Sequence, residues 1–199
     1  MESSQSQYKA NYGVEVEAKV ANPRSSVRSS DFLLRLLAVV TTLVAAIIIG
    51  VARETKMVPF SLLSNVPPSY IPLTAKSHYS SAFVFFTVSN AIACAYAALS
   101  LLLLIAKRAR GNAITLATTI ISLDVIMVGL LFSGNGAAAA IGLLGYQGNS
   151  HANWQKVCNV FGTYCHQVAA SIGVSLLGSL LFVLLVLLAV LNLHKTNTS

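Results

Sequence analysis

The chain has 199 residues, of which 55% are hydrophobic and only 10% are charged, and its formal net charge is +7. Soluble domains carry about 25% charged residues, so this composition excludes an ordinary soluble protein and indicates that lipid is the solvent. The basic excess does not indicate a nucleic-acid partner, because no soluble basic face with aromatic residues accompanies it.

Residues 1–31 form a Ser-rich tail with few large apolar side chains, and we expect this tail to be disordered. Several of its serines lie beside Arg24 and Arg28. Phosphorylation of these serines could control a contact with acidic lipids. The alternative is that the tail is simply solvated.

Four apolar runs follow the tail, and each is long enough to be a transmembrane helix. An α-helix needs about 20 residues to cross a hydrocarbon core of about 30 Å, and it satisfies its own backbone hydrogen bonds there. The sequence therefore predicts an all-α membrane protein, a four-transmembrane-helix bundle in residues 32–194 with a short tail at 195–199. The predicted spans are residues 32–52, 82–106, 113–133 and 168–193.

Lys and Arg residues are unequally distributed between the two sides of these spans. Eight lie in the two tails and in the loop KRARGN between the second and third runs, whereas four lie on the opposite side. Cytoplasmic segments of membrane proteins carry an excess of Lys and Arg. We therefore expect a multi-pass protein with cytoplasmic N- and C-termini.

Arg35 is a charged residue within the first run, three residues after Phe32. Its long side chain leans back toward the cytoplasm and can reach the lipid head groups. The other interpretation is that Arg35 pairs with a carboxylate inside the bundle. The sequence does not decide between the two.

The segment between the first and second runs, residues 53–81, is rich in proline. A continuous helix is disfavoured at this density, so we expect an extended or turn-rich outer loop. The prolines are Pro59, Pro67, Pro68 and Pro72.

Asp124 lies in the middle of the third apolar run. A charge at the bilayer centre costs about 2.5–3.5 kcal/mol on insertion scales, so such a residue is a candidate functional site. On this register Asp124 lies about 12 Å deeper than Arg35, and the sequence does not establish an ion pair. Asp124 must contact other helices, bind a partner or be protonated. Candidate hydrogen-bonding partners are Ser122 of another subunit, Asn90, Ser171 and Ser175.

Small residues recur at four-residue spacing along three of the runs, which lets helices approach closely. They predict helix packing, either inside one bundle or across a dimer face. In chain order they are Ser89, Ala93 and Ala97, then Gly129 and Ser133, then Ser171, Ser175 and Ser179. The stretch SGNGAAAAIGLLGYQGNS is expected to continue the third helix and then fray.

The last outer loop reads HANWQKVCNVFGTYCHQ, and Cys158 and Cys165 have six residues between them. Because this loop lies outside the cell on the predicted topology, we expect a disulfide. A metal site from both cysteines with His151 and His166 is the alternative, although C-x6-C-H is no recognised zinc spacing. Trp154 is expected to anchor the loop at the membrane interface.

Catalytic machinery is not indicated by this sequence. It contains no plausible nucleophile–base pair, carboxylate dyad or H-x-x-H motif. We therefore expect a protein that is not an enzyme and needs no cofactor or metal.

Three features in order resemble the plant Casparian strip membrane domain protein-like (CASP-like) family, which is distantly similar to MARVEL-type four-span proteins. They are Arg in LLRLLAVV, Asp in SLDVIMVG and the loop NWQKVCNVFGTYCHQ before the fourth run. The resemblance covers roughly residues 28–194. It carries the family's intramembrane Arg and Asp over to Arg35 and Asp124, and its outer-loop cysteine pair to Cys158 and Cys165.

The resemblance implies a plasma-membrane scaffold that associates with itself and with related family members, as homo- or heterodimers or larger assemblies. In the Casparian strip branch such platforms recruit enzymes that modify the cell wall. The founding members carry an acidic and aromatic signature in the first outer loop, whereas this loop has no acidic residue after Glu54. A CASP-like relative acting in other tissues therefore fits better.

Two other functions remain open. Asp124 could be the ion or proton site of a small oligomeric transporter or channel, although the runs hold few other polar residues to line a path. The chain could also be an accessory subunit that stabilises a larger membrane complex. Membrane lipids surround the protein in every case.

Overall fold

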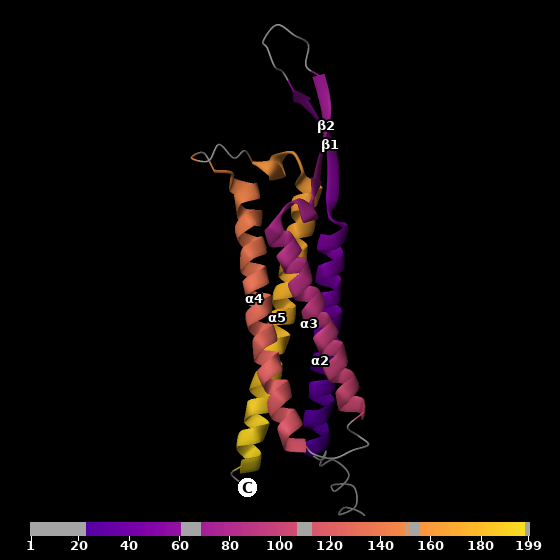
Figure 1. Ribbon diagram of the computed structural model, residues 1–199, viewed down its shortest axis with the longest axis vertical. Coiled ribbons are helices and arrows are strands. Elements are labelled where there is room, and N and C mark those ends of the chain that lie inside the picture. Colours follow the sequence, from indigo (N-terminus) through magenta and orange to yellow (C-terminus); the bar gives the residue numbers. More distant parts are fainter. Residues whose placement is uncertain (1–22, 61–68, 107–112, 150, 152–155, 198–199) are drawn as a thin grey trace, which may run out of the picture.

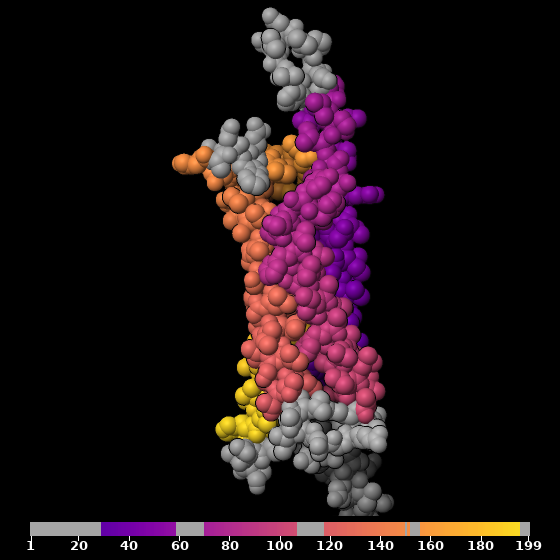
Figure 2. Space-filling model, viewed as in Figure 1, coloured from indigo at the N-terminus to yellow at the C-terminus, as the bar shows by residue number. Residues whose placement is uncertain are grey.

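The computed structural model describes residues 23–60, 69–106, 113–149, 151 and 156–197. Four long helices form a slender bundle, and a two-stranded hairpin extends from one end of it (Figures 1 and 2). All four helices are long and apolar enough to cross a membrane, which confirms the predicted four-span fold. They are α2 (Pro23–Val51), α3 (Ser81–Ala106), α4 (Ala113–Gln147) and α5 (Gly162–Asn197).

The first helix begins before the apolar run. Because α2 starts at Pro23, residues 23–31 are helical, and the prediction that they are disordered is wrong. Adding residues to an existing helix costs little compared with nucleating one, and proline is well suited to the first turn. Residues 1–22 of the predicted tail lie outside the described residues.

The third and fourth helices are also longer than predicted. As expected, the Ala/Gly stretch continues the third helix, which ends at Gln147 rather than at residue 133. Gly148 follows with φ 71°, and its N–H donates to the Leu144 carbonyl over 2.8 Å. A residue in this left-handed conformation commonly terminates a helix, and glycine adopts it without strain.

The outer loop between α2 and α3 contains a β-hairpin, which agrees with the extended loop predicted there. Strands β1 (Arg53–Phe60) and β2 (Ser69–Lys76) pair antiparallel, with Arg53 opposite Lys76. Pro59 and Pro72 lie within these strands. A two-stranded sheet tolerates them because each strand has a free edge where no N–H is needed. A 3-10 turn, η2 (Ser77–Tyr79), connects β2 to α3.

In the bundle, α2 and α4 lie on a diagonal, and each packs against both α3 and α5. The N-terminus of α2 and the C-terminus of α5 lie at the end opposite the hairpin (Figure 1). Buried apolar side chains form two separate clusters along the bundle axis. The cluster nearer the hairpin includes Ile49, Phe83, Phe86, Tyr164 and Val168. The other includes Ala38, Met127, Leu131, Phe182 and Leu185.

Candidate functional site

A layer of polar side chains separates the two apolar clusters. Its centre is the serine stripe of α5, whose members are fully buried: Ser171, Ser175 and Ser179. Ser171 donates its hydroxyl to the Ala45 carbonyl of α2 over 2.8 Å. Ser175 donates to Asn90 Oδ1 of α3 over 2.9 Å. The small residues of α5 therefore pack inside one bundle.

The same stripe reaches α4 through Asn135, a residue that was not predicted from the sequence. Asn135 Nδ2 donates to Ser179 Oγ over 3.0 Å, and Asn135 is only 3% exposed. Its Oδ1 has no partner among the described residues. One serine face of α5 thus contacts α2, α3 and α4 in turn, which fixes the relative positions of all four helices.

Arg35 and Asp124 form a buried ion pair beyond the second apolar cluster. Arg35 Nη2 lies 3.0 Å from Asp124 Oδ2, and Nη1 lies 3.4 Å from Oδ1. Their side chains are 5% and 0% exposed. Because α2 and α4 lie on a diagonal of the bundle, this pair joins two helices that are not neighbours.

Both members of the pair have further partners. Tyr96 donates its hydroxyl to Asp124 Oδ1 over 2.8 Å, and the Ile120 carbonyl lies 3.0 Å from the same hydroxyl. Arg35 donates to Ser100 Oγ over 2.9 Å, and its Nε lies 3.3 Å from Asp31 Oδ1. The site is therefore a network across three helices rather than an isolated pair.

Tyr96 and Ser100 were not predicted as partners of the pair, although the sequence contains a usable signal. Residues four apart lie on the same helix face, and both are hydroxyl side chains in an otherwise apolar run. The candidates proposed for Asp124 bond elsewhere: Ser175 pairs with Asn90, and Ser122 donates to the Thr118 carbonyl of its own helix. The predicted contacts of Asp124 with Asn90, Ser171 and Ser175 are therefore wrong, because Ser171 donates to Ala45 instead. The predicted contact with Ser122 of another subunit stays a prediction.

The predicted difference in depth between the two charges is wrong because the spans do not start where the apolar runs start: the first span starts three residues earlier than its run, and the third starts five residues later. The candidate spans are Ser29–Val51 and Thr118–Gln147. Arg35 and Asp124 each lie about 9 Å from the start of their span at 1.5 Å per residue. The two charges are therefore at the same depth.

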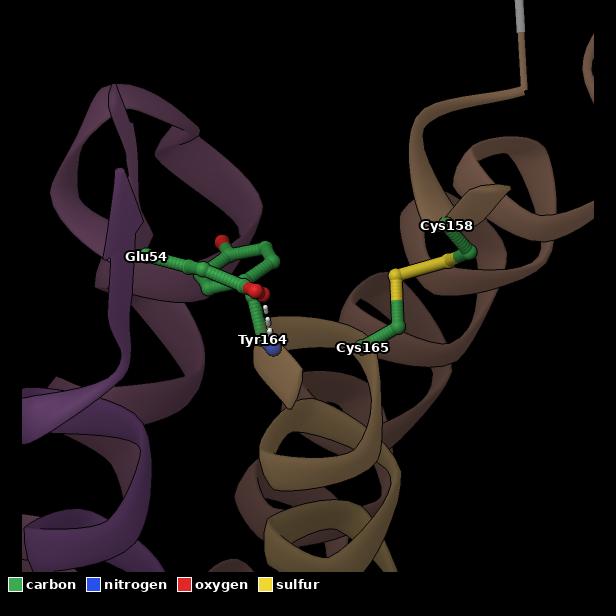
Figure 3. Close-up of a disulfide and its surroundings, with 4 residues drawn as sticks. All are labelled: Glu54, Cys158, Tyr164 and Cys165. Atoms are coloured by element: carbon green, nitrogen blue, oxygen red, sulfur yellow. Dashed lines mark hydrogen bonds between the residues drawn. A yellow bond between two sulfur atoms is a disulfide. The ribbon is translucent and has the colours of Figure 1, made fainter. Parts of the chain in front are cut away.

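At the hairpin end, a disulfide joins Cys158 and Cys165, whose Cα atoms are 5.7 Å apart (Figure 3). Oxidised cysteines do not ligate metals, so the alternative metal site with His151 and His166 is excluded for this state. The bond ties η4 (Val157–Asn159) to the first turns of α5. Trp154 lies outside the described residues.

Glu54 connects the hairpin to the same region. Its Oε2 accepts a hydrogen bond from the Tyr164 backbone N–H over 2.9 Å (Figure 3), and Lys56 Nζ lies 3.2 Å from its Oε1. The Tyr164 N–H is one of the free donors at the start of α5, and it lowers the pKa of the Glu54 carboxyl below its usual value. The base of the hairpin is thereby fastened to α5.

One stripe of small residues does not pack inside the bundle. Gly129 and Ser133 of α4 are exposed, and a Cβ added at Gly129 would meet nothing within 4 Å. By contrast, Ser89, Ala93 and Ala97 of α3 are buried. The α4 stripe is thus available to the surrounding lipid or to another helix.

The chain matches the family model for the Casparian strip membrane protein domain over residues 24–181. It is 60% identical to CASP-like protein 1E1 of Glycine max over 181 residues, which cover 91% of this chain and 95% of the relative. It is also 51% identical to CASP-like protein 1E1 of Vitis vinifera over 190 residues, covering 94% and 93%.

With CASP-like protein 1E1 of Arabidopsis thaliana it shares 44% identity over 181 residues, which cover 91% of this chain and 94% of the relative. No solved structure matches the chain. The matched residues contain both members of the ion pair, the serine stripe and the disulfide. The chain therefore belongs to the CASP-like family of multi-pass membrane proteins.

Proposed function

We propose that the protein is a non-enzymatic scaffold of the plasma membrane that associates with copies of itself and with related chains to organise a membrane domain, linked to local modification of the cell wall. The observation that carries this proposal is the internal pairing of Arg35 and Asp124. Both oxygens of Asp124 have donors within its own chain. The charges stabilise one rigid bundle, and such a bundle suits an assembly unit.

Lateral association requires a lipid-facing surface that another helix can approach. The exposed α4 stripe of Gly129 and Ser133 provides one, because small residues at four-residue spacing let helix backbones come close. In lipid, van der Waals packing rather than the hydrophobic effect drives such contacts. We place the contact between copies on this face.

The same pairing argues against Asp124 as the ion or proton site of a transporter. A transport site needs a carboxylate that can release its partners to a moving ion, whereas Asp124 is fully buried and held by Arg35 and Tyr96. Proton flux into liposomes that is lost in Asp124→Asn would instead favour the transporter. Capture of one unrelated protein at fixed stoichiometry, with little self-association, would favour an accessory subunit.

Fluorescence recovery of the tagged protein in a plant plasma membrane tests the proposal. Wild type should recover slowly, and Gly129→Leu should recover several-fold faster because the leucine side chain blocks close helix approach. Gly173→Leu is the matched control, since Gly173 is an exposed glycine on α5 with nothing within 4 Å of an added Cβ. Fast recovery of wild type at matched surface levels would refute the scaffold, and equal effects of both variants would refute the α4 contact.

A further inference from the structure

A large apolar groove lies at the hairpin end of the bundle, and neither the ion pair nor the serine stripe is part of it. Its volume is about 840 Å³, within the range of about 300–1,000 Å³ for small-molecule sites. Parts of α4 and α5 form its walls, among them Gly142, Val168 and Ile172, and the Cys158–Cys165 disulfide lines it as well.

Tyrosines mark the level of the groove in the membrane. Tyr79 and Tyr146 line it from the two sides and are 68% and 69% exposed. Tyrosine is enriched at the boundary between hydrocarbon and head groups. We therefore expect the apolar part of the groove, at Val168 and Ile172, to lie on the hydrocarbon side of this boundary.

A basic residue, Lys76, lies at the rim of the groove. Lys76 lines it and also lines a smaller adjoining cavity of about 400 Å³, whose other ionisable lining residues are Arg53 and His78. The Asp and Glu residues of the described part of the chain are engaged elsewhere, two with Arg35 and one with Lys56. The Lys76 ammonium lies over an aromatic face, with Nζ 5.7 Å from the centre of the Tyr79 ring.

We propose that this groove binds one acyl chain of an anionic phospholipid from the leaflet at the hairpin end, with the phosphate of its head group at Lys76. The Lys76 ammonium at the rim complements the phosphate, and the apolar walls complement the chain. A partner helix is a poorer occupant. An α-helix has a diameter of about 10–12 Å, so this volume can enclose only about two helical turns or fewer. That length is too short for a helix to dock.

The test uses the purified full-length protein in detergent, titrated with dioleoyl phosphatidylglycerol or dioleoyl phosphatidylcholine, with bound lipid counted by native mass spectrometry. We expect one phosphatidylglycerol to bind about fivefold more tightly than phosphatidylcholine, the factor for one basic contact with an anionic lipid. Lys76→Gln should remove this preference. The matched control is Lys156→Gln, because Lys156 is exposed at the same end and lines neither cavity.

A second pair of variants tests the groove itself. A Cβ at Gly142 would make ordinary contacts of 3.8 Å with Val168 and 4.0 Å with Ile172, so Gly142→Leu should fold and project into the groove. It should weaken binding of both lipids several-fold, whereas Gly136→Leu on the outer face of α4 should not. If Gly142→Leu does not fold, Ala139→Leu replaces it.

Three results would overturn the proposal. The first is the absence of a preference for phosphatidylglycerol. The second is an equal loss in Lys76→Gln and Lys156→Gln, which would indicate a general charge effect. The third is a folded groove variant that binds lipid as wild type does. None of these results depends on lateral association, so the lipid-binding proposal can fail while the proposed scaffold function is retained, and the reverse also holds.

Discussion

Replacing Asp124 by leucine tests how much the ion pair contributes to the bundle. The change leaves Arg35 buried and removes both of its contacts with Asp124. Breaking one partner of a buried pair costs about 3–5 kcal/mol. In the variant Arg35 can still donate to Ser100 Oγ and pair with the partly exposed Asp31. We therefore expect the lower end of this range, about 3 kcal/mol of lost unfolding free energy.

Three companion variants separate the contributions of the two charges. Arg35→Leu should cost more, about 4 kcal/mol, because Asp124 is fully buried and then has only the Tyr96 hydroxyl as donor. Asp124→Asn keeps an acceptor but loses the charge, and should cost about 2 kcal/mol. In the double variant no fully buried charge is left unpaired, because Asp31 is partly exposed, and Tyr96 can still donate to the Ile120 carbonyl. We therefore expect the double variant to be more stable than either single variant.

The free energy of unfolding can be measured by titrating dodecyl sulfate into mixed micelles and following the helix signal by circular dichroism. Ser122→Leu is the control, since Ser122 is exposed on the same helix and its change should stay within about 0.5 kcal/mol of wild type. A double variant whose loss equals the sum of the two single losses would show that Arg35 and Asp124 do not interact. The ion pair would then have no part in stabilising the bundle.

Three further predictions concern the hairpin end and the helix contacts. Cys158→Ser should lower the unfolding free energy by about 2 kcal/mol, and a reductant should have the same effect on wild type but none on the variant. The Tyr164 N–H lowers the pKa of the Glu54 carboxyl. The hydrogen bond between them therefore stabilises the folded protein at neutral pH, and this stabilisation should be lost as pH falls below the usual carboxyl pKa near 4.5. Glu54→Gln should remove this pH dependence of the thermal midpoint; an unchanged profile would contradict the contact. A Cβ at Gly134 would lie 3.2 Å from a side chain of α3, so Gly134→Val should lower the unfolding free energy by about 1–3 kcal/mol. Gly136→Val is the control, because a Cβ there meets nothing within 4 Å. Equal stability of the two variants would contradict the close packing at Gly134.

The arrangement of the polar residues explains how a bundle with two charges in its interior can be a rigid unit. The serine stripe of α5 contacts the three other helices, and the Arg35–Asp124 pair joins the remaining diagonal. Buried polar groups that are fully paired specify one packing arrangement, whereas apolar surfaces in lipid slide at little cost. The lipid-facing side is then available for contacts with other chains and with lipid.

Several features of this protein follow from the sequence alone because they depend on composition and local pattern. Runs of about 20 apolar residues can only span a membrane as helices, so four spans were predictable. The continuation of the third helix through its Ala/Gly stretch and the disulfide between Cys158 and Cys165 were also expected, and both are present. Arg35 and Asp124 stood out because charges within apolar runs are costly.

Only the tertiary structure decides which residues meet. Pairing of Arg35 with Asp124 depends on helix starts, helix lengths and diagonal placement, which a hydropathy pattern does not contain. Tyr96 contacts the ion pair because α3 packs against both α2 and α4, and the face of α3 that carries Tyr96 points toward the pair. Likewise, the serines of α5 and the α4 stripe of Gly129 and Ser133 have the same four-residue spacing, yet the α5 stripe is buried and the α4 stripe is exposed. Spacing defines a helix face, but only the packing of the other helices determines what that face contacts.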